Sequence, residues 1–176
     1  MSDRLESIQR FIRDIDDFPK PGIVFKDWTP ILAEPAAFED VIDLLAEPFY
    51  DKGIDQVLGM EARGFLLGVP VAMRLGAGFV PVRKPGKLPY DTYDVTYDLE
   101  YGTDTLEMHT DALTSGHRVL IVDDLLATGG TASATVELIK KTGGEIVACA
   151  FLIELDYLDG RERLDVDEVY SLLHYS

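Results

Sequence analysis

One stretch decides the expected fold: Val119-Leu120-Ile121-Val122-Asp123-Asp124-Leu125-Leu126-Ala127-Thr128-Gly129-Gly130-Thr131. It opens with an apolar, largely β-branched run, which is typical of a strand buried on both faces of a parallel sheet. Two aspartates, Asp123 and Asp124, follow this strand. A turn of small residues then leads into a helix predicted over 131–142, which ends at Gly143.

Outward from this stretch, strands and helices are predicted in alternation. The expected strands are 56–59, 77–82, 118–122, 145–155 and 168–172, and the expected helices are 35–46, 64–75 and 131–142. Leu5, Ile8, Phe11, Ile12 and Ile15 recur at helical spacing, which predicts an amphipathic N-terminal helix. Alternating elements favour an α/β fold with a mainly parallel twisted sheet flanked by helices, in a single domain over 1–176.

The segment 83–98 departs from this alternation. It is polar and rich in Pro, Gly, Asp and Tyr. A loop of that length in a compact domain usually serves an active site, although a mobile surface insertion is the alternative. Short strands at 99–101 and 105–109, separated by Gly102, predict a small hairpin after it.

Composition excludes some function classes. The 176 residues carry a formal net charge of −16, which argues against nucleic-acid binding because that affinity depends on Lys and Arg. Between Glu61 and Tyr90, however, Glu61 is the only acid among basic residues, so a local cationic patch is expected. The apolar runs are too short to span a bilayer, no signal-peptide pattern opens the chain, and Cys149 is the single cysteine. We expect a cytoplasmic protein without membrane contact.

The turn after Val122 has the chemistry of an anion site. Ligands of open α/β sheets bind beyond the carboxyl ends of the strands, and N–H groups at a helix start bind phosphate. Aspartates would repel a phosphate, but they suit ribose hydroxyls, which need acceptors. The stretch is neither a P-loop nor a dinucleotide fingerprint. The alternative is a capped helix whose two aspartates are exposed turn residues.

The stretch resembles the phosphoribosyl pyrophosphate (PRPP) signature of type I phosphoribosyltransferases, and its ending is closest to the adenine-specific members. The resemblance covers roughly 18–151. Other segments match in the same order: Phe18-Pro19-Lys20-Pro21-Gly22-Ile23-Val24-Phe25-Lys26-Asp27, Gly59-Met60-Glu61-Ala62-Arg63-Gly64-Phe65, Val82-Arg83-Lys84-Pro85-Gly86-Lys87-Leu88-Pro89 and Leu99-Glu100-Tyr101-Gly102.

This resemblance implies roles for the residues that bind PRPP. The 5′-phosphate would lie on Ala127, Thr128, Gly129, Gly130 and Thr131. Asp123 and Asp124 would hold the ribose hydroxyls, directly or through Mg²⁺, a hard cation that bridges pyrophosphate oxygens. Arg63 would grip the pyrophosphate. Arg83, Lys84 and Lys87 lie at the root of the long loop, and its closure would exclude water and bring them onto the leaving group.

Other residues are candidates for chemistry at the base. Glu100 is the candidate acid/base, although it could instead face solvent. Phe25 is the expected stacking platform, with Leu125 or Leu126 on the opposite face, unless Phe25 is a core residue. The backbone of Val24 would read the adenine edge. Lys26 stands where the family more often has arginine, and lysine lacks the planar guanidinium.

The resemblance therefore implies an enzyme of purine salvage, which converts adenine and PRPP to AMP and pyrophosphate with Mg²⁺ and acts as a homodimer. Two alternatives stay open. One is the same reaction on hypoxanthine, guanine, xanthine or uracil. The other is a ligand-sensing regulator of the same fold, which the short acidic N-terminal region argues against because it offers no basic DNA-binding module.

Overall fold

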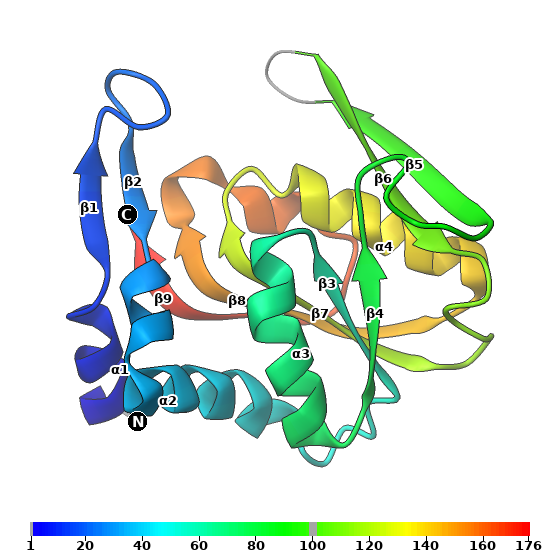
Figure 1. The fold of residues 1–176 in the computed structure, drawn as a ribbon, viewed down its shortest axis with the longest axis horizontal. Coiled ribbons are helices and arrows are strands. Elements are labelled where there is room, and N and C mark those ends of the chain that lie inside the picture. The colour runs from blue at the N-terminus through cyan, green and yellow to red at the C-terminus, as the bar shows by residue number, and fades with distance from the viewer. Residues whose placement is uncertain (1, 99–101) are drawn as a thin grey trace. The chain divides into compact units, whose positions relative to one another are not determined.

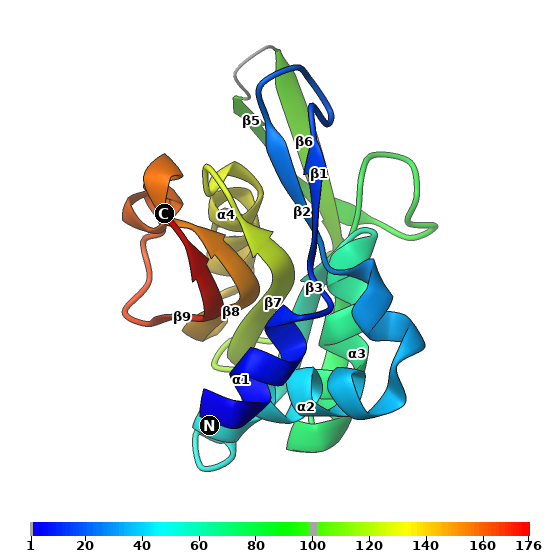
Figure 2. The same cartoon turned by 90° about the vertical axis from the view of Figure 1, so that its left-hand side faces the viewer.

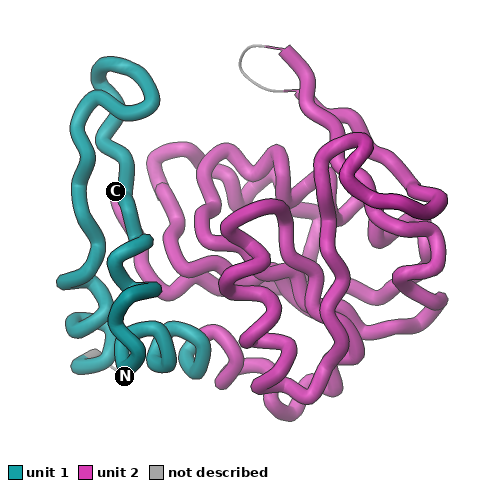
Figure 3. The backbone as a smooth tube through the Cα atoms, in the orientation of Figure 1, with its two compact units in different colours: residues 1–44 teal, residues 45–176 magenta. Residues whose placement is uncertain are grey.

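The computed structural model describes residues 2–98 and 102–176, and the chain forms two compact units, Met1–Leu44 and Leu45–Ser176 (Figure 3). Unit 1 contains the helix α1 (Ser2–Gln9), the strands β1 (Arg13–Asp16) and β2 (Val24–Asp27), the 3-10 helix η1 (Thr29–Ala33) and most of α2 (Pro35–Ala46). Helix α2 is confirmed as predicted. No helix of the described residues is long and apolar enough to cross a membrane.

The N-terminal helix is shorter than predicted. It ends at Gln9, and Ile15 belongs instead to an antiparallel hairpin in which it pairs with Phe25. Ion pairs across this hairpin join Arg13 to Asp27 at 2.5 Å and Lys26 to Asp14 at 2.7 Å. The helical spacing of apolar residues was misleading because a short, exposed hairpin has no buried face to impose an alternating pattern.

Unit 2 is built on the predicted parallel sheet. Its strands are β3 (Gln56–Met60), β4 (Gly78–Val82), β7 (Arg118–Leu126), β8 (Glu145–Leu155) and β9 (Val169–Tyr175), in the order β4-β3-β7-β8-β9, and every neighbouring pair is parallel. Val119 to Val122 are fully buried, as expected for a central strand between two layers. Strand β7 runs beyond its predicted end at Val122, because pairing with β8 continues to Leu126 and Glu154.

The helices of unit 2 cover opposite faces of this sheet (Figures 1 and 2). Helix α3 (Arg63–Leu75) leads from β3 to β4, whereas α4 (Gly130–Thr142) leads from β7 to β8 in the opposite direction along the sheet. Because such crossovers are right-handed, this reversal puts the helices on different faces. Between β3 and β7 the order therefore switches, and their carboxyl ends leave a crevice where ligands bind in such folds.

The hairpin of unit 2 corrects the prediction of a long loop. Strand β5 (Thr92–Asp98) pairs antiparallel with β6 (Thr103–His109), so the loop 83–98 is wrong from Thr92 onward. Val95 is buried while its neighbours are partly or fully exposed, so a strand covered on one face looked like a polar loop. The predicted strand 99–101 lies outside the described residues. The short 3-10 helices η2 (Glu47–Phe49), η3 (Asp156–Leu158) and η4 (Gly160–Arg163) were not predicted.

Candidate active site

A cavity of about 330 Å³ opens at the crevice between β3 and β7. Residues after β3, the end of β7 and the first turn of α4 line it: Glu61, Ala62, Arg63, Asp123, Asp124, Leu125, Leu126, Ala127, Thr128, Gly129, Gly130, Thr131 and Ala132. The structure therefore brings together Arg63, both aspartates and the whole turn that the sequence singled out.

Arg63 and Asp124 form an ion pair in this cavity. The guanidinium Nε lies 2.7 Å from the carboxylate Oδ2, and Asp124 is only 4% exposed. Arg63 is the first residue of α3, and the peptide bond between Glu61 and Ala62 just before it is cis. The segment after β3 and the end of β7 thus place a positive and a negative side chain in contact at the cavity.

Asp123 points toward the first turn of α3. Its Oδ1 accepts the backbone N–H of Asp124 at 2.9 Å, and a Cβ added to Gly64 would lie 2.8 Å from the same oxygen. Burial, and then the negative charge of Asp124, raise the pKa of Asp123 well above its usual value. Asp124 is buried and Asp123 is partly buried, and both lie within β7, so neither is an exposed turn residue.

The turn 127–131, called the anion loop below, joins β7 to α4. Gly129 has a left-handed backbone (φ 78°), and the first helical hydrogen bond runs from the N–H of Ser133 to the Gly129 carbonyl. The N–H groups before Ser133 consequently have no acceptor within the helix. Such groups, at the positive end of a helix, are suited to bind an anion, and they lie on the cavity wall.

Tyr97 on β5 is a neighbour of the anion loop that the sequence analysis missed. Its hydroxyl lies 3.3 Å from Oγ1 of Thr131, and its ring would lie 3.3 Å from a Cβ on Gly130. Burial raises the pKa of Tyr97 above its usual value, so it is a neutral hydrogen-bonding group here. The strand alternation of 92–98 was the signal that could have found it.

Glu61 joins the loop that carries Arg83, Lys84 and Lys87, called the basic loop below, to the cavity wall. One carboxylate oxygen accepts a hydrogen bond from Nε of Arg83 at 2.9 Å and from the backbone N–H of Lys84 at 3.1 Å. The side chain of Lys84 pairs with Asp104 at 3.1 Å, and that hydrogen bond raises the pKa of Lys84. Lys87 is exposed farther along the loop. Arg83 and Lys84 thus converge on a residue of the cavity.

The candidate base-binding residues divide between the units. Leu125 lines the cavity, whereas Val24, Phe25 and Lys26 belong to β2 of unit 1. Phe25 is half-buried and meets Phe18 edge to face, with ring centroids 5.2 Å apart, and Val24 is exposed. The candidate acid/base Glu100 lies outside the described residues.

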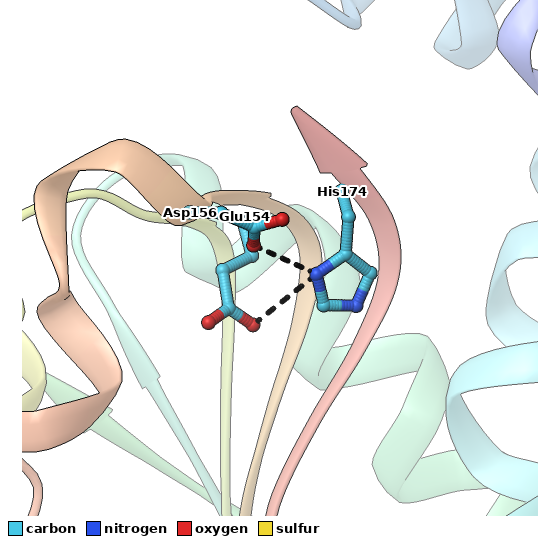
Figure 4. A group of neighbouring side chains, drawn as sticks. All are labelled: Glu154, Asp156 and His174. Carbon is cyan, nitrogen blue, oxygen red and sulfur yellow. Dashed lines mark hydrogen bonds and ion pairs between the residues drawn. The ribbon is translucent and has the colours of Figure 1, made fainter. Parts of the chain in front are cut away.

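Three carboxylates line the cavity: Glu61, Asp123 and Asp124. The last two, near the end of β7, are the candidate oxygen ligands for a cation, which suits Mg²⁺ bound mainly by substrate oxygens and water. A second group, Glu154, Asp156 and His174, lies at the ends of β8 and β9 (Figure 4), with ligand atoms within 4.8 Å of one another. Both Glu154 oxygens already accept hydrogen bonds from Arg161, and one also accepts from Ser171. This second group is an ion-pair network.

The fold and the cavity define an α/β protein of the type I phosphoribosyltransferase class, with an anion loop at the switch point of a parallel sheet. The model of the phosphoribosyl transferase domain family matches residues 27–173, and the chain belongs to that family.

Individual relatives agree with this assignment. Adenine phosphoribosyltransferase of Geotalea daltonii is 57% identical over 97% of this chain and 100% of its own length. The crystal structure of adenine phosphoribosyltransferase from Thermoanaerobacter pseudethanolicus is 53% identical, with a TM-score of 0.94 over 97% of this chain and 99% of that chain. The Saccharomyces cerevisiae enzyme, complexed with an imino-altritol bisphosphate and adenine, is 40% identical, with a TM-score of 0.93 over 98% of this chain and 99% of that chain.

Proposed function

We propose that this chain transfers the phosphoribosyl group of PRPP to adenine, giving AMP and pyrophosphate in purine salvage. The main observation behind the proposal is the cavity at the switch point, which the anion loop lines together with Asp123, Asp124 and Arg63. A phosphorylated sugar needs N–H donors for its phosphate and acceptors for its hydroxyls, and the cavity offers both. The names of the relatives at 57% identity support adenine as the base.

In this reaction the C1–oxygen bond to pyrophosphate breaks while a bond from adenine N9 to C1 forms. The anion loop would bind the 5′-phosphate, and Asp123 and Asp124 would accept hydrogen bonds from the ribose hydroxyls. Arg63 would bind the pyrophosphate through its guanidinium. The pair with Asp124 holds Arg63 at the cavity before substrate arrives, which reduces the entropy lost on binding.

The basic loop would stabilise the leaving group. The Arg83 side chain and the Lys84 backbone are bonded to Glu61, a residue of the cavity wall. Movement of this loop would bring Arg83, Lys84 and Lys87 onto the pyrophosphate. Positive charge placed where negative charge develops lowers the barrier, and excluding water protects the electron-poor C1 carbon from hydrolysis. Glu100 would accept the proton that leaves N9. It is the carboxylate in the segment Leu99-Glu100-Tyr101-Gly102, and a carboxylate can act as a general base.

For the base, Phe25 would stack on adenine, Leu125 would cover its other face, and the Val24 backbone would pair with its polar edge. Lys26 already pairs with Asp14 in the hairpin, so we assign it the support of this hairpin rather than stacking. Mg²⁺, held by Asp123 and Asp124 through substrate and water, would neutralise the pyrophosphate charge when bound.

The organisation of the molecule is also part of the proposal. The family match over 27–173 spans both units, which supports one functional phosphoribosyltransferase domain. A homodimer is supported by an apolar stripe on α3, where Leu66, Val69 and Met73 are exposed, Met73 to 77%. Sedimentation of the wild type and of Met73→Asp tests this; a wild-type monomer would contradict the dimer. A cytoplasmic location stays a prediction.

One assay tests the activity. AMP formation is measured with PRPP and adenine, with and without Mg²⁺, beside hypoxanthine, guanine, xanthine and uracil. We expect adenine to be converted fastest and the rate to fall when Mg²⁺ is chelated. Faster conversion of another base would overturn the adenine assignment. Binding of PRPP without any nucleotide product would favour the ligand-sensing regulator.

A further inference from the structure

Segment 160–163, called the supporting segment below, packs against the back of the anion loop. A Cβ added to Gly160 would overlap the carbonyl oxygen of Ala127 and lie 3.0 Å from the backbone nitrogen of Gly129. A Cβ on Gly129 would in turn overlap the carbonyl of Gly160. The two backbones touch because neither residue has a side chain, and Gly160 itself does not have a left-handed backbone.

Arg163 adds a second contact to the same loop. One guanidinium nitrogen donates to the carbonyl oxygen of Thr128 at 3.2 Å. In a trans peptide the C=O and the following N–H point to opposite sides. Because the Ala127 and Thr128 carbonyls face the supporting segment, the N–H groups of Thr128 and Gly129 point away from it. These are donors that a phosphate at the anion loop would use.

The supporting segment is itself anchored to the sheet. Arg161 forms a two-pronged pair with Glu154 at the end of β8, at 3.0 and 2.7 Å, and donates to the Val169 carbonyl at 3.1 Å. Ser171 of β9 donates to the same carboxylate at 2.6 Å. His174 lies 2.9 Å from Asp156 beside this network (Figure 4). Leu164, next in the chain, is buried in the core.

None of residues 160–163 is among the described residues that line the cavity. We propose that Gly160 and Arg163 are positioning residues, which hold the anion loop in the conformation that binds the 5′-phosphate. The inference rests on the proposed function for the identity of the substrate. It predicts that both residues affect the binding of phosphorylated ligands without touching them.

The test measures three quantities on the full chain: KM for PRPP, kcat, and the dissociation constant of ribose 5-phosphate by calorimetry. Arg163→Met removes the donor to Thr128. We expect it to weaken the binding of both PRPP and ribose 5-phosphate about tenfold, which corresponds to a loss of about 1.4 kcal/mol. The kcat at saturating PRPP should change less than threefold. Arg163→Lys keeps a donor and should recover most of the affinity.

Salt separates positioning from simple charge loss. If Arg163 acted only as a distant positive charge, the ratio of the ribose 5-phosphate dissociation constants of Arg163→Met and the wild type would fall toward one as ionic strength rises. If Arg163 instead holds the anion loop in place, this ratio should stay the same from 0.05 to 0.5 M salt. Over that range the Debye length falls from about 14 to 4 Å. If high salt removed the difference in affinity between Arg163→Met and the wild type, the positioning role of Arg163 would be overturned.

Gly160→Ala is expected to have a larger effect, because backbone atoms on both sides cannot yield as a flexible side chain could. The matched control is Gly78→Ala, because the three atoms nearest to its Cβ all belong to the side chain of Gln56, which can move. Its affinity for ribose 5-phosphate should equal that of the wild type. Should Gly160→Ala fail to fold, Arg163→Met still decides the matter. Unchanged ribose 5-phosphate binding in Arg163→Met overturns the inference.

The outcomes also separate this inference from the proposed function. A wild type that binds ribose 5-phosphate but forms no AMP contradicts the function, while the variants still test the supporting segment. AMP formation with equal ligand affinities in wild type and Arg163→Met contradicts the inference alone. A wild type that neither binds ribose 5-phosphate nor forms AMP contradicts both.

Discussion

Arg63, the first residue of α3, and Asp124, near the end of β7, are joined by an ion pair of 2.7 Å. Asp124 is buried and Arg63 is half-exposed, so the pair fixes the guanidinium at the cavity while leaving part of it open. The carboxylate therefore has two functions in the proposed reaction: it accepts from ribose, and it orients the arginine.

Asp124→Asn should accordingly weaken PRPP binding more than it lowers kcat. A hydrogen bond to a charged group contributes about 1.5–3 kcal/mol, so KM for PRPP is expected to rise about 10- to 100-fold. Asp165→Asn is the control, because Asp165 is an exposed residue paired with Lys140 outside the cavity. Equal KM values in the wild type and Asp124→Asn would remove Asp124 from ribose binding.

Gly64→Ala should impair the site by displacing the carboxylate of Asp123. The added Cβ would lie 2.8 Å from Asp123 Oδ1 and 3.3 Å from the Val122 carbonyl, although alanine is otherwise the better helix former. Overpacking typically costs about 1–3 kcal/mol, and we expect kcat/KM for PRPP to fall at least about tenfold. Steady-state kinetics, with Gly78→Ala for comparison, measures this. Wild-type kinetics in Gly64→Ala would argue that the position of Asp123 is unimportant.

Glu100→Ala should lower kcat by about 10²- to 10⁴-fold, the usual contribution of a general acid or base. KM for PRPP should change little, because the proposed role is proton transfer and not binding. Glu137→Ala, at an exposed position of α4, controls for the loss of one negative charge. If Glu100→Ala turned over adenine at the wild-type rate, another group would have to accept the proton.

The central sheet and the anion loop could be predicted because their signals are local. A strand buried on both faces needs a continuous apolar run, and 118–122 and 145–155 have one. Parallel strands then bring their carboxyl ends to one edge, which places Asp123 and Arg63 near each other without further information.

The hairpins and the supporting segment could not be predicted in the same way. Strand β1 is exposed throughout, and in β5 only Val95 is fully buried. The alternation of Tyr93, Val95 and Tyr97 is therefore a weak strand signal among polar residues. Gly160 touches Gly129 across about thirty positions of sequence. A glycine required by close approach looks like any other glycine until the partner backbone is known.

The Glu154 network should make stability depend on pH. The hydrogen bond from Arg161, together with that from Ser171, holds the pKa of Glu154 below its usual value. A depressed pKa in the folded state stabilises the fold above the unfolded value, about 4.3, and that stability is lost as pH falls through the folded pKa.

Glu154→Gln removes this carboxylate and tests the dependence. At pH 7 we expect the free energy of unfolding to fall by about 1–3 kcal/mol, since charged hydrogen bonds to a buried group are lost. The difference in unfolding free energy between Glu154→Gln and the wild type should become smaller below about pH 4. Urea unfolding from pH 3 to 7 measures it, with Glu137→Gln as the exposed control. A difference that stays constant with pH would mean that the charge of Glu154 does not stabilise the fold.

Cys149 should be unreactive until the chain unfolds. The residue is 0% exposed in the centre of β8, and burial raises the pKa of its thiol to about 12. At pH 8 the reactive thiolate is then about one part in 10⁴, and the reagent has no access to the sulfur. Mass spectrometry after iodoacetamide treatment should detect no adduct on the native protein and one adduct in 6 M guanidinium chloride.

Because alkylation requires opening of the central sheet, its rate under native conditions reports that opening. Rapid modification of the folded enzyme would mean that β8 separates from β7 or β9 far more often than a buried parallel strand should.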